Sequence, residues 1–226
     1  MIANEVIFLA QILCVALGCI VMLRLGCAAL TSYIACLGLL SNLLVCKEIV
    51  LFGLTVTASD SLAVGMLLGL NLMQEWFGKK AARDAIYINF LILLLYLVLT
   101  QIHLLYMPGP LDKLDMHYQL LLGFIPRLAI ASLTSCLIVQ LADNALYRWL
   151  AQSLHGRWFT LRNTISLCLS EGLDTILFSV LGLYGLVSSI SDIIIFSYVI
   201  KLISIGCFIP LIALIKKLVP HDKQNI

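Results

Sequence analysis

Residues 162–185 read RNTISLCLSEGLDTILFSVLGLYG, an apolar run long enough to cross a bilayer as a helix, which takes about 20 residues. Glu171 and Asp174 nevertheless lie near the middle of this run. Each carboxylate costs roughly 2.5–3.5 kcal/mol at mid-membrane on insertion scales, and lipid offers no compensating interaction. Residues three, four and seven apart share a helix face, so Glu171, Asp174 and Phe178 point the same way. The run therefore predicts a transmembrane helix that forms one wall of a polar cavity.

The composition of the whole chain agrees with this class. Of its 226 residues, 62% are hydrophobic and 12% are charged, and the mean hydropathy is +1.07. No stretch has the composition of a soluble catalytic domain. The eight cysteines are scattered through apolar runs without a CxxC pair, which predicts small packing residues and neither disulfides nor metal ligands. The start, MIANEVIFLA, lacks the basic region of a signal peptide and is interpreted as a retained helix.

Seven apolar segments of transmembrane length follow one another along the chain. They are predicted at residues 5–25, 28–46, 57–77, 85–106, 119–143, 163–187 and 192–215. The start of the third segment is the least defined, because LFGLTVTA (51–58) is rich in β-branched residues and contains Gly53. We expect a loop or a short strand-like excursion there.

Basic residues in the short loops predict the orientation of the segments. They follow the third segment, separate the fifth from the sixth and make up the tail; they are Lys79, Lys80, Arg83, Arg148, Arg157, Arg162, Lys216, Lys217 and Lys223. Such loops are expected on the cytoplasmic side. The loop MPGPLDKLDMHYQ (107–119) sets one lysine against two aspartates, so we expect it outside. The N-terminus is then outside and the C-terminus cytoplasmic.

Further polar residues fall inside the other segments. Asn42 lies in the second segment, Asn71 in the third, and Tyr198 and Lys201 share a face in the last. In the fifth segment Arg127 follows Pro126; we expect this proline to kink a helix interior and to free carbonyl groups for a cavity. An ionisable group inside the membrane is a functional candidate by default.

These residues also have structural interpretations. Asn42 and Asn71 are alternatively interhelical hydrogen-bonding residues, as polar groups in bundles often are. Asp174 and Lys201 are alternatively a structural ion pair between the last two segments. For Glu75 and Asp143, near the cytoplasmic interface, the alternative is pairing with a nearby base: Lys79, Arg83 or Arg148. The structural interpretation of Lys47 and Glu48 is a surface ion pair at the outer boundary of the membrane.

Catalytic patterns are absent from the sequence. The four histidines do not cluster, and there is no HExxH, no serine–base spacing and no Walker motif. We therefore predict no enzymatic activity, no cofactor and no metal site.

The order and spacing of the polar residues resemble a known family. The pattern runs from Asn42 and Lys47-Glu48 through Asn71-x-x-x-Glu75-Trp76-Phe77-Gly78-Lys79-Lys80-Ala81-x-Arg83, Arg127-x-x-x-x-Ser132, Gln140-x-x-Asp143 and Ser166 to Asp174-Thr175-x-x-Phe178 and Tyr198-x-x-Lys201. This pattern is similar to that of the queuosine precursor transporter family, also called vitamin-uptake-transporter-like, over about residues 30–215. Many members have Asp where this chain has Asn71, which puts in doubt any role that needs a charge there.

The resemblance implies a fold and an activity. It implies an all-α integral membrane protein with a compact six-helix transporter core, similar to the substrate-binding subunits of energy-coupling-factor transporters. Here the core would span 28–218, preceded by an extra helix at 1–27 and followed by a cytoplasmic tail at 219–226. It also implies uptake of queuine, preQ0 or preQ1 for tRNA modification across the bacterial inner membrane. We expect no direct binding of nucleic acid, and a homodimer is left open.

The chemistry of a 7-deazaguanine base fits the polar residues. The base presents N–H donors beside a carbonyl, so a carboxylate can accept from the donors while Asn, Lys or Arg donates to the carbonyl. An aromatic ring can stack on the flat base, and a second carboxylate can match the amine of preQ1 or queuine. The predicted substrate site comprises Asn42, Asn71, Arg127, Glu171, Asp174, Phe178, Tyr198 and Lys201.

Three competing functions follow from these observations. The first is a stand-alone carrier, and the alternative is a substrate-capture subunit of an energy-coupled importer. The third class, an intramembrane enzyme or a structural membrane protein, is disfavoured. The sequence lacks the catalytic residues that an enzyme would need. A purely structural role would leave the mid-membrane acids and bases unexplained.

Overall fold

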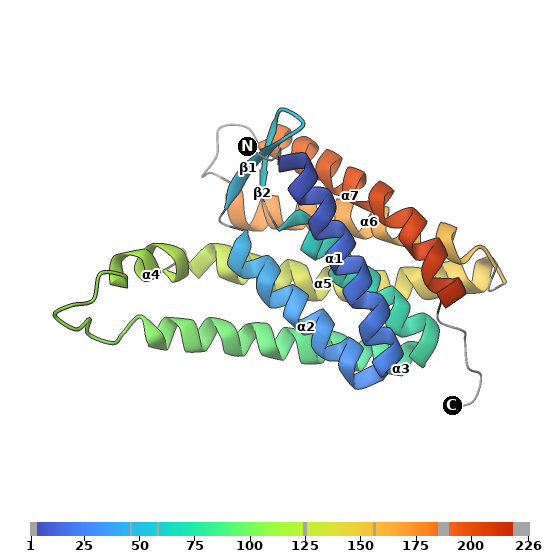
Figure 1. Ribbon diagram of the computed structural model, residues 1–226, viewed down its shortest axis with the longest axis horizontal. Helices are drawn as coiled ribbons and strands as arrows, with labels where there is room; N and C mark the ends of the chain where they lie inside the picture. The colour runs from blue at the N-terminus through green and yellow to red at the C-terminus, as the bar shows by residue number, and fades with distance from the viewer. Residues whose placement is uncertain are drawn as a thin grey trace.

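The expected class, an all-α integral membrane protein, is confirmed. The computed structural model describes residues 4–45, 47–57, 59–123, 126–155, 157–184 and 190–218. Its helices are α1 (Asn4–Leu25), α2 (Cys27–Leu44), α3 (Asp60–His103), α4 (Asp115–Leu122), α5 (Pro126–Ser153), α6 (Phe159–Phe178) and α7 (Ile190–Leu218). A π-helical turn, η1 (Ser179–Leu183), continues α6. All of these helices except the short α4 are long and apolar enough to cross a membrane (Figure 1).

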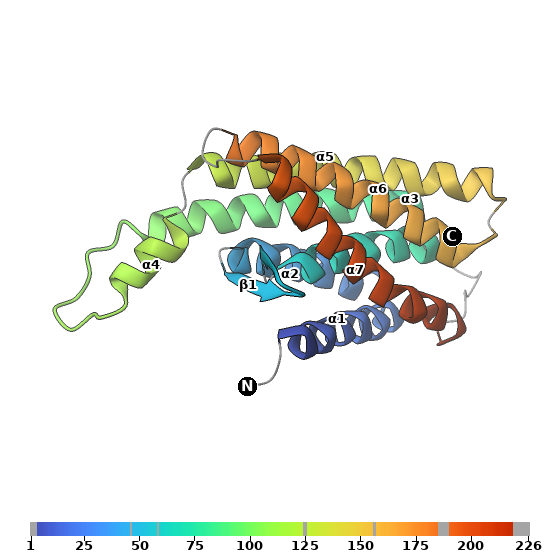
Figure 2. The same cartoon turned by 90° about the horizontal axis from the view of Figure 1, so that it is seen from above.

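The longest helix, α3, accounts for two of the seven predicted segments. It contains 44 residues, and a straight helix of that length would measure about 66 Å, roughly twice the hydrocarbon thickness of a bilayer. Gly78 breaks it with φ 86° and ψ 172°, a conformation that only glycine adopts readily. The arms 60–77 and 79–103 run in opposite directions from this kink (Figures 1 and 2). The predicted segments 57–77 and 85–106 are therefore two spans joined by one residue.

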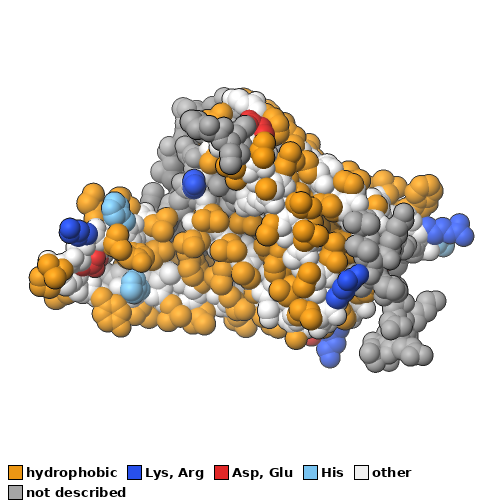
Figure 3. Space-filling view, in the orientation of Figure 1, with side chains coloured by type: hydrophobic (Ala, Val, Ile, Leu, Met, Phe, Trp, Pro, Cys, Tyr) orange, Lys and Arg blue, Asp and Glu red, His pale blue; other side chains and the backbone are white. Residues whose placement is uncertain are grey.

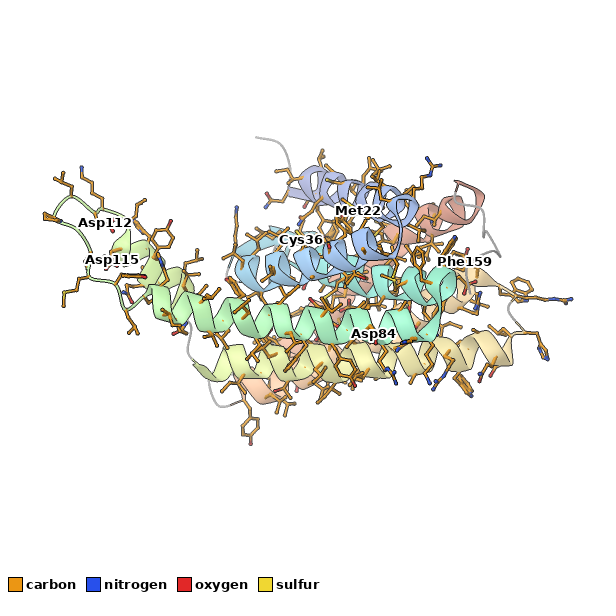
Figure 4. All side chains as sticks on the ribbon, turned by 90° about the horizontal axis from the view of Figure 1, so that it is seen from below. Met22, Cys36, Asp84, Asp112, Asp115 and Phe159 are labelled. Atoms are coloured by element: carbon orange, nitrogen blue, oxygen red, sulfur yellow. The ribbon has the colours of Figure 1, made fainter. Side chains whose placement is uncertain are left out.

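The exposed surface separates apolar from charged side chains along the long axis of the molecule. In Figure 3, hydrophobic side chains cover the middle, and Lys and Arg gather mainly toward the two ends. One end carries α4 and the exposed loop residues Asp112 and Lys113; Figure 4 labels Asp112 and Asp115 there. The other end carries the Gly78 kink and the connection between α5 and α6. An extended apolar surface with its charged side chains mainly near the two ends is typical of a multi-pass protein in lipid.

The excursion expected before the third segment is confirmed as a β-hairpin. Strands β1 (Glu48–Leu51) and β2 (Leu54–Thr57) pair antiparallel, with Leu51 opposite Leu54. The hairpin is tied to the start of α1, because Asn4 Nδ2 donates to the Val50 carbonyl at 3.0 Å and Glu5 accepts from the Phe52 amide at 3.2 Å. It leads directly into the buried start of α3.

Helix α1, the predicted extra N-terminal helix, packs closely on the rest of the bundle. It buries Phe8, Ile12 and Val15, and the side chain of Val15 occupies the space where a Cβ on Gly65 of α3 would lie. Small residues permit such close helix approaches in membranes. Helix α1 is therefore an integral part of the described bundle.

The expected kink at Pro126 is wrong. Pro126 is the first residue of α5, where its missing N–H is harmless and its fixed φ suits a helix start. The predicted segment 119–143 accordingly shifts: residues 115–122 form the short α4, and the span extends to Ser153. The proline inside a helix is Pro210, in α7.

Replacing Gly78 by alanine should destabilise the protein by about 1–3 kcal/mol, the usual cost of a strained backbone conformation. A Cβ at Gly78 meets nothing within 4 Å, so the cost is purely conformational. Gly206 of α7 is the matched control, because a Cβ there also meets nothing within 4 Å and the residue is helical. Thermal unfolding of the detergent-purified variants measures the difference. Equal melting temperatures for Gly78→Ala and Gly206→Ala would contradict the assignment of the kink to this residue.

Cysteine labelling should place the two ends of the bundle on opposite sides of the membrane. In a background without other cysteines, Lys113→Cys should react with an impermeant reagent added outside, and Arg157→Cys only after the membrane is opened. Both side chains are exposed, so access depends on sidedness alone. The reverse pattern would invert the predicted topology.

Candidate functional site

A lysine and two carboxylates meet inside the bundle between α6 and α7. Lys201 Nζ lies 2.6 Å from Asp174 Oδ2 and 2.9 Å from Glu171 Oε2. The Lys201 side chain is 6% exposed and that of Glu171 is 1% exposed, whereas the side chain of Asp174 is 26% exposed. Lys201 and Asp174 therefore form the ion pair that the structural interpretation describes, and Glu171 joins them.

This cluster carries more negative than positive charge. A third acid, Asp60 at the start of α3, is 5% exposed and lies within electrostatic range of both Lys201 and Glu171. Among the described residues, Lys201 is the base at ion-pair distance from both Glu171 and Asp174. Neither oxygen of Glu171 receives a well-oriented hydrogen bond in the described part of the chain, although Lys201 is at ion-pair distance. The cluster therefore retains acceptor capacity and an excess of negative charge, which suit a cationic or donor-rich ligand.

A second polar group lies next to the cluster, between α5 and α6. Asp143 is fully buried, and its Oδ1 accepts hydrogen bonds from Ser166 Oγ at 2.6 Å and from Ser170 Oγ at 2.7 Å. Ser170 immediately precedes Glu171, so the two groups adjoin along α6. The alternative interpretation of Asp143, pairing with a nearby base, is wrong, because none of the ion pairs in the described ranges includes it.

A third polar group closes the end of the bundle near the Gly78 kink. Arg162 Nη2 donates to Glu75 Oε1 at 2.8 Å, and Tyr147 donates from its hydroxyl to Glu75 Oε2 at 2.9 Å. The Arg162 guanidinium lies 5.4 Å from the centroid of the Tyr147 ring and 6.0 Å from that of Phe159, which Figure 4 labels. Asn163 donates to the Tyr147 hydroxyl at 3.3 Å. The group is an ion pair enclosed by aromatic rings.

Two predictions about this group are corrected. Arg162 was expected in a cytoplasmic loop, but it is 1% exposed inside α6. Glu75 was expected, on the structural reading, to pair with Lys79, Arg83 or Arg148, but it pairs with Arg162, 87 positions away. The reason is the kink at Gly78, which reverses the chain direction. Lys79 and Arg83 are exposed beyond the kink, whereas Glu75 before it lies against α6.

The three groups form one polar track along a single face of α6. Their α6 members are spaced by one, three or four residues, which places them on one side of a helix; they are Arg162, Asn163, Ser166, Ser170, Glu171 and Asp174. Helices α3, α5 and α7 supply the partners. The track runs from the closed end at Arg162 to the acidic cluster around Lys201.

Several buried polar side-chain atoms of α3, α5 and α6 have no hydrogen-bond partner among the described residues. They belong to four helix segments and include Asn71 Nδ2, Asn89 Oδ1, Ser135 Oγ, Gln140 Oε1, Asp143 Oδ2 and Asn163 Oδ1. Buried polar groups in folded proteins are almost always paired, so such a concentration marks a place where a polar ligand or water completes the bonding. The sequence pattern singled out Gln140 and Asp143, which are three residues apart, but it gave no indication of their partners.

The other predicted site residues lie in different surroundings. Asn42 of α2 accepts a hydrogen bond from Ser132 of α5, the contact its interhelical interpretation describes. Tyr198 donates from its hydroxyl to the Cys168 carbonyl at 3.1 Å, and its ring packs over Gly172, so it joins α7 to α6. Phe178 is half-buried at the end of α6. The side chain of Arg127 lies outside the described residues.

Together these features define a multi-pass helical membrane protein with a charged, incompletely bonded polar track in its interior. The chain matches the family model described as "Putative vitamin uptake transporter" over residues 57–215. It is also similar to the "Probable queuosine precursor transporter" of Bacillus subtilis (strain 168), with 28% identity over 188 residues that cover 82% of each chain. No solved structure matches it.

The protein belongs to this vitamin uptake transporter family, as the sequence pattern indicated. The matched region contains α3, α5, α6 and nearly all of α7, and therefore every residue of the polar track. The chain is a transporter by this membership.

Removing the ammonium of Lys201 should destabilise the protein more than any surface change. Lys201→Met leaves Glu171 and Asp174 without their cation, and breaking a buried ion pair from one side costs about 3–5 kcal/mol. Adding Glu171→Gln should restore part of the loss, because it removes the most deeply buried charge. Lys80→Met, at an exposed position, is the control. If the Lys201→Met protein has the same melting temperature as the wild type, the ion pair contributes no stability.

Proposed function

We propose that this protein imports a queuosine precursor, a 7-deazaguanine base such as queuine, preQ0 or preQ1, across the bacterial inner membrane for tRNA modification. The observation that carries the proposal is the acidic cluster around Lys201, which lies inside a bundle of a transporter family. The name of the Bacillus subtilis relative supports the choice of substrate.

The charge of the cluster suits the arm of the substrate. PreQ1 and queuine carry an amine that is cationic at neutral pH, and a carboxylate pairs with such an amine at short range. Asp174 is the candidate partner, because its side chain is the more exposed of the two carboxylates bound to Lys201. Lys201 would then remain paired with Glu171 while Asp174 binds the amine of the ligand. The added cation would offset the excess negative charge of Glu171 and Asp174 over Lys201.

The remaining predicted residues are proposed to flank the flat base. Asn71 supplies a buried amide donor without a partner among the described residues. Phe178 and Tyr198 supply aromatic surface on either side of the cluster along α6 and α7. Asn42 and Arg127 complete the proposed set from α2 and α5. We further propose that the C-terminus is cytoplasmic, so that the basic ends of the helices face the cell interior.

Uptake into proteoliposomes tests the proposal directly. The purified protein alone should accumulate labelled preQ1, and unlabelled queuine and preQ0 should compete with it. Binding of preQ1 without uptake would instead favour a capture subunit that needs a separate energising module. Neither binding nor uptake of any of the three bases would refute the proposed substrate class.

The variant Asp174→Asn tests the role of the cluster. It keeps the shape of the side chain, and Lys201 keeps Glu171 as a partner, so the protein should remain abundant. Loss of the charge-assisted bond to the amine should lower apparent preQ1 affinity about tenfold to a hundredfold, which corresponds to about 1–3 kcal/mol. PreQ0, whose arm is a neutral nitrile, should be affected less.

The control is Asp84→Asn, the same change in an exposed carboxylate on the second arm of α3, labelled in Figure 4. It should transport both bases normally. A stable Asp174→Asn protein that transports preQ1 as the wild type does would rule out the binding role of Asp174. A structural role would instead appear as low abundance that the added change Lys201→Met rescues.

A further inference from the structure

We propose that Asp143, assisted by Gln140 and Asn71, recognises the guanine-like edge of the transported base, namely its ring N–H, its 2-amino group and its neighbouring carbonyl. This inference rests on the proposed function. It assigns base selectivity to a carboxylate that lies outside the Lys201 cluster and outside the site predicted from sequence.

The Asp143 carboxylate is buried and only partly hydrogen-bonded. The residue is fully buried, and both serine hydroxyls donate to the same oxygen, Oδ1. The other oxygen, Oδ2, is buried without a partner in the described part of the chain. A buried carboxylate that lacks a cation and half of its hydrogen bonds is costly, so a purely structural role does not account for it.

Gln140 lies one turn before Asp143 on the same face of α5. Its Nε2 points at sulfur atoms, 2.8 Å from Cys136 Sγ and 3.3 Å from Met66 Sδ. Its Oε1 is therefore turned the other way, and it is buried with no donor among the described residues. Asp143 and Gln140 thus offer two adjacent acceptors that both lack a donor.

Asn71 of α3 supplies a hydrogen-bond donor at about the same depth in the bundle as Asp143 of α5. Gln140 contacts Met66 and Tyr147 contacts Glu75, so α5 and the first arm of α3 run parallel in that register. Asn71 lies between Met66 and Glu75, and Asp143 lies between Gln140 and Tyr147. Asn71 is 1% exposed, and its Nδ2 donor has no partner in the described ranges.

These atoms are complementary to a guanine-like edge. The ring N–H and the 2-amino group are two donors side by side, which the unpaired Asp143 Oδ2 and Gln140 Oε1 can accept, one each. The adjacent carbonyl is an acceptor, which an amide N–H such as that of Asn71 can satisfy. A single ligand edge would thereby pair buried atoms that the described residues leave unpaired.

Asp143 also lies close to the carboxylates proposed to bind the amine-bearing substituent of the base. Ser170, which holds Asp143, and Asp174 are four residues apart on α6, about 6 Å or one helical turn. A base whose edge meets Asp143 therefore directs its substituent along the track toward Glu171 and Asp174.

The test compares two bases that differ only in this edge. 7-Deazaguanine has the 2-amino donor, whereas 7-deazaxanthine has a carbonyl acceptor there that would face the Asp143 carboxylate. Competing against labelled preQ1 in proteoliposomes, 7-deazaguanine should inhibit wild-type uptake at a concentration about tenfold to a hundredfold lower than 7-deazaxanthine. Equal inhibition by the two bases would overturn the inference. This comparison uses the wild-type protein alone.

The variant Asp143→Asn should reverse the preference. The two serine hydroxyls retain the amide oxygen as their acceptor, so the amide presents its N–H donor to the 2-carbonyl of 7-deazaxanthine, and Gln140 Oε1 can accept from the ring N–H. Asp84→Asn should keep the wild-type preference, because it alters an exposed carboxylate away from the track. An abundant Asp143→Asn protein that still prefers 7-deazaguanine would overturn the inference.

The two proposals fail in different ways. If the wild type takes up preQ1 but does not distinguish the two edges, only the role of Asp143 is wrong. If the wild type neither binds nor takes up preQ1, the proposed function is wrong and this inference falls with it.

Discussion

The ammonium group of Lys201 is the interaction on which the interior of this protein depends. It lies within 2.9 Å of Glu171 and 2.6 Å of Asp174, two acids that α6 carries into the apolar part of the bundle. Without a cation at this position, burial of these charges would oppose the insertion and packing of α6. The contact also fixes how α7 lies on α6, because Tyr198, one turn before Lys201, packs over Gly172 and bonds to the Cys168 carbonyl. Charge neutralisation and helix packing are thus parts of one contact.

The rest of the polar interior follows from the same constraint. Since lipid cannot satisfy polar groups, every such side chain in a spanning helix must turn toward the other helices. The serines of α6 meet Asp143, and Arg162 meets Glu75, so the polar residues of four helices become one track. The Arg162 end of the track holds the ion pair with Glu75 and is enclosed by Tyr147 and Phe159, whereas its middle retains unpaired donors and acceptors. A transporter needs both properties, a closed end and a region that a ligand can complete.

Much of the fold was predictable because hydropathy and helix length are local properties. The seven segments, the excursion before the third and the shared face of Glu171 and Asp174 all follow from spacing along the chain. The partners of the buried charges were not predictable in this way. Glu75 has Lys79 and Arg83 within one or two turns in sequence, yet Gly78 reverses the chain and leaves Arg162 as its partner.

The misassigned residues share a physical cause. Arg162 stands close to Arg157 in sequence and was grouped with it as a loop base, although only Arg157 is exposed. Asp143 was placed at the interface because its segment was bounded too early, when α5 in fact continues ten residues further to Ser153. In both cases the depth of a charge depends on where a helix ends, which is the least certain part of a hydropathy pattern.

An experimental structure of the protein with preQ1 bound is the measurement that tests the central claim most directly. The account predicts density for the base between α3, α5 and α6, with its edge at Asp143 and its amine within hydrogen-bond distance of Asp174 or Glu171. Density for the base at a site remote from both carboxylate groups, with the Lys201 ion pairs and the Asp143–serine bonds unchanged, would contradict it.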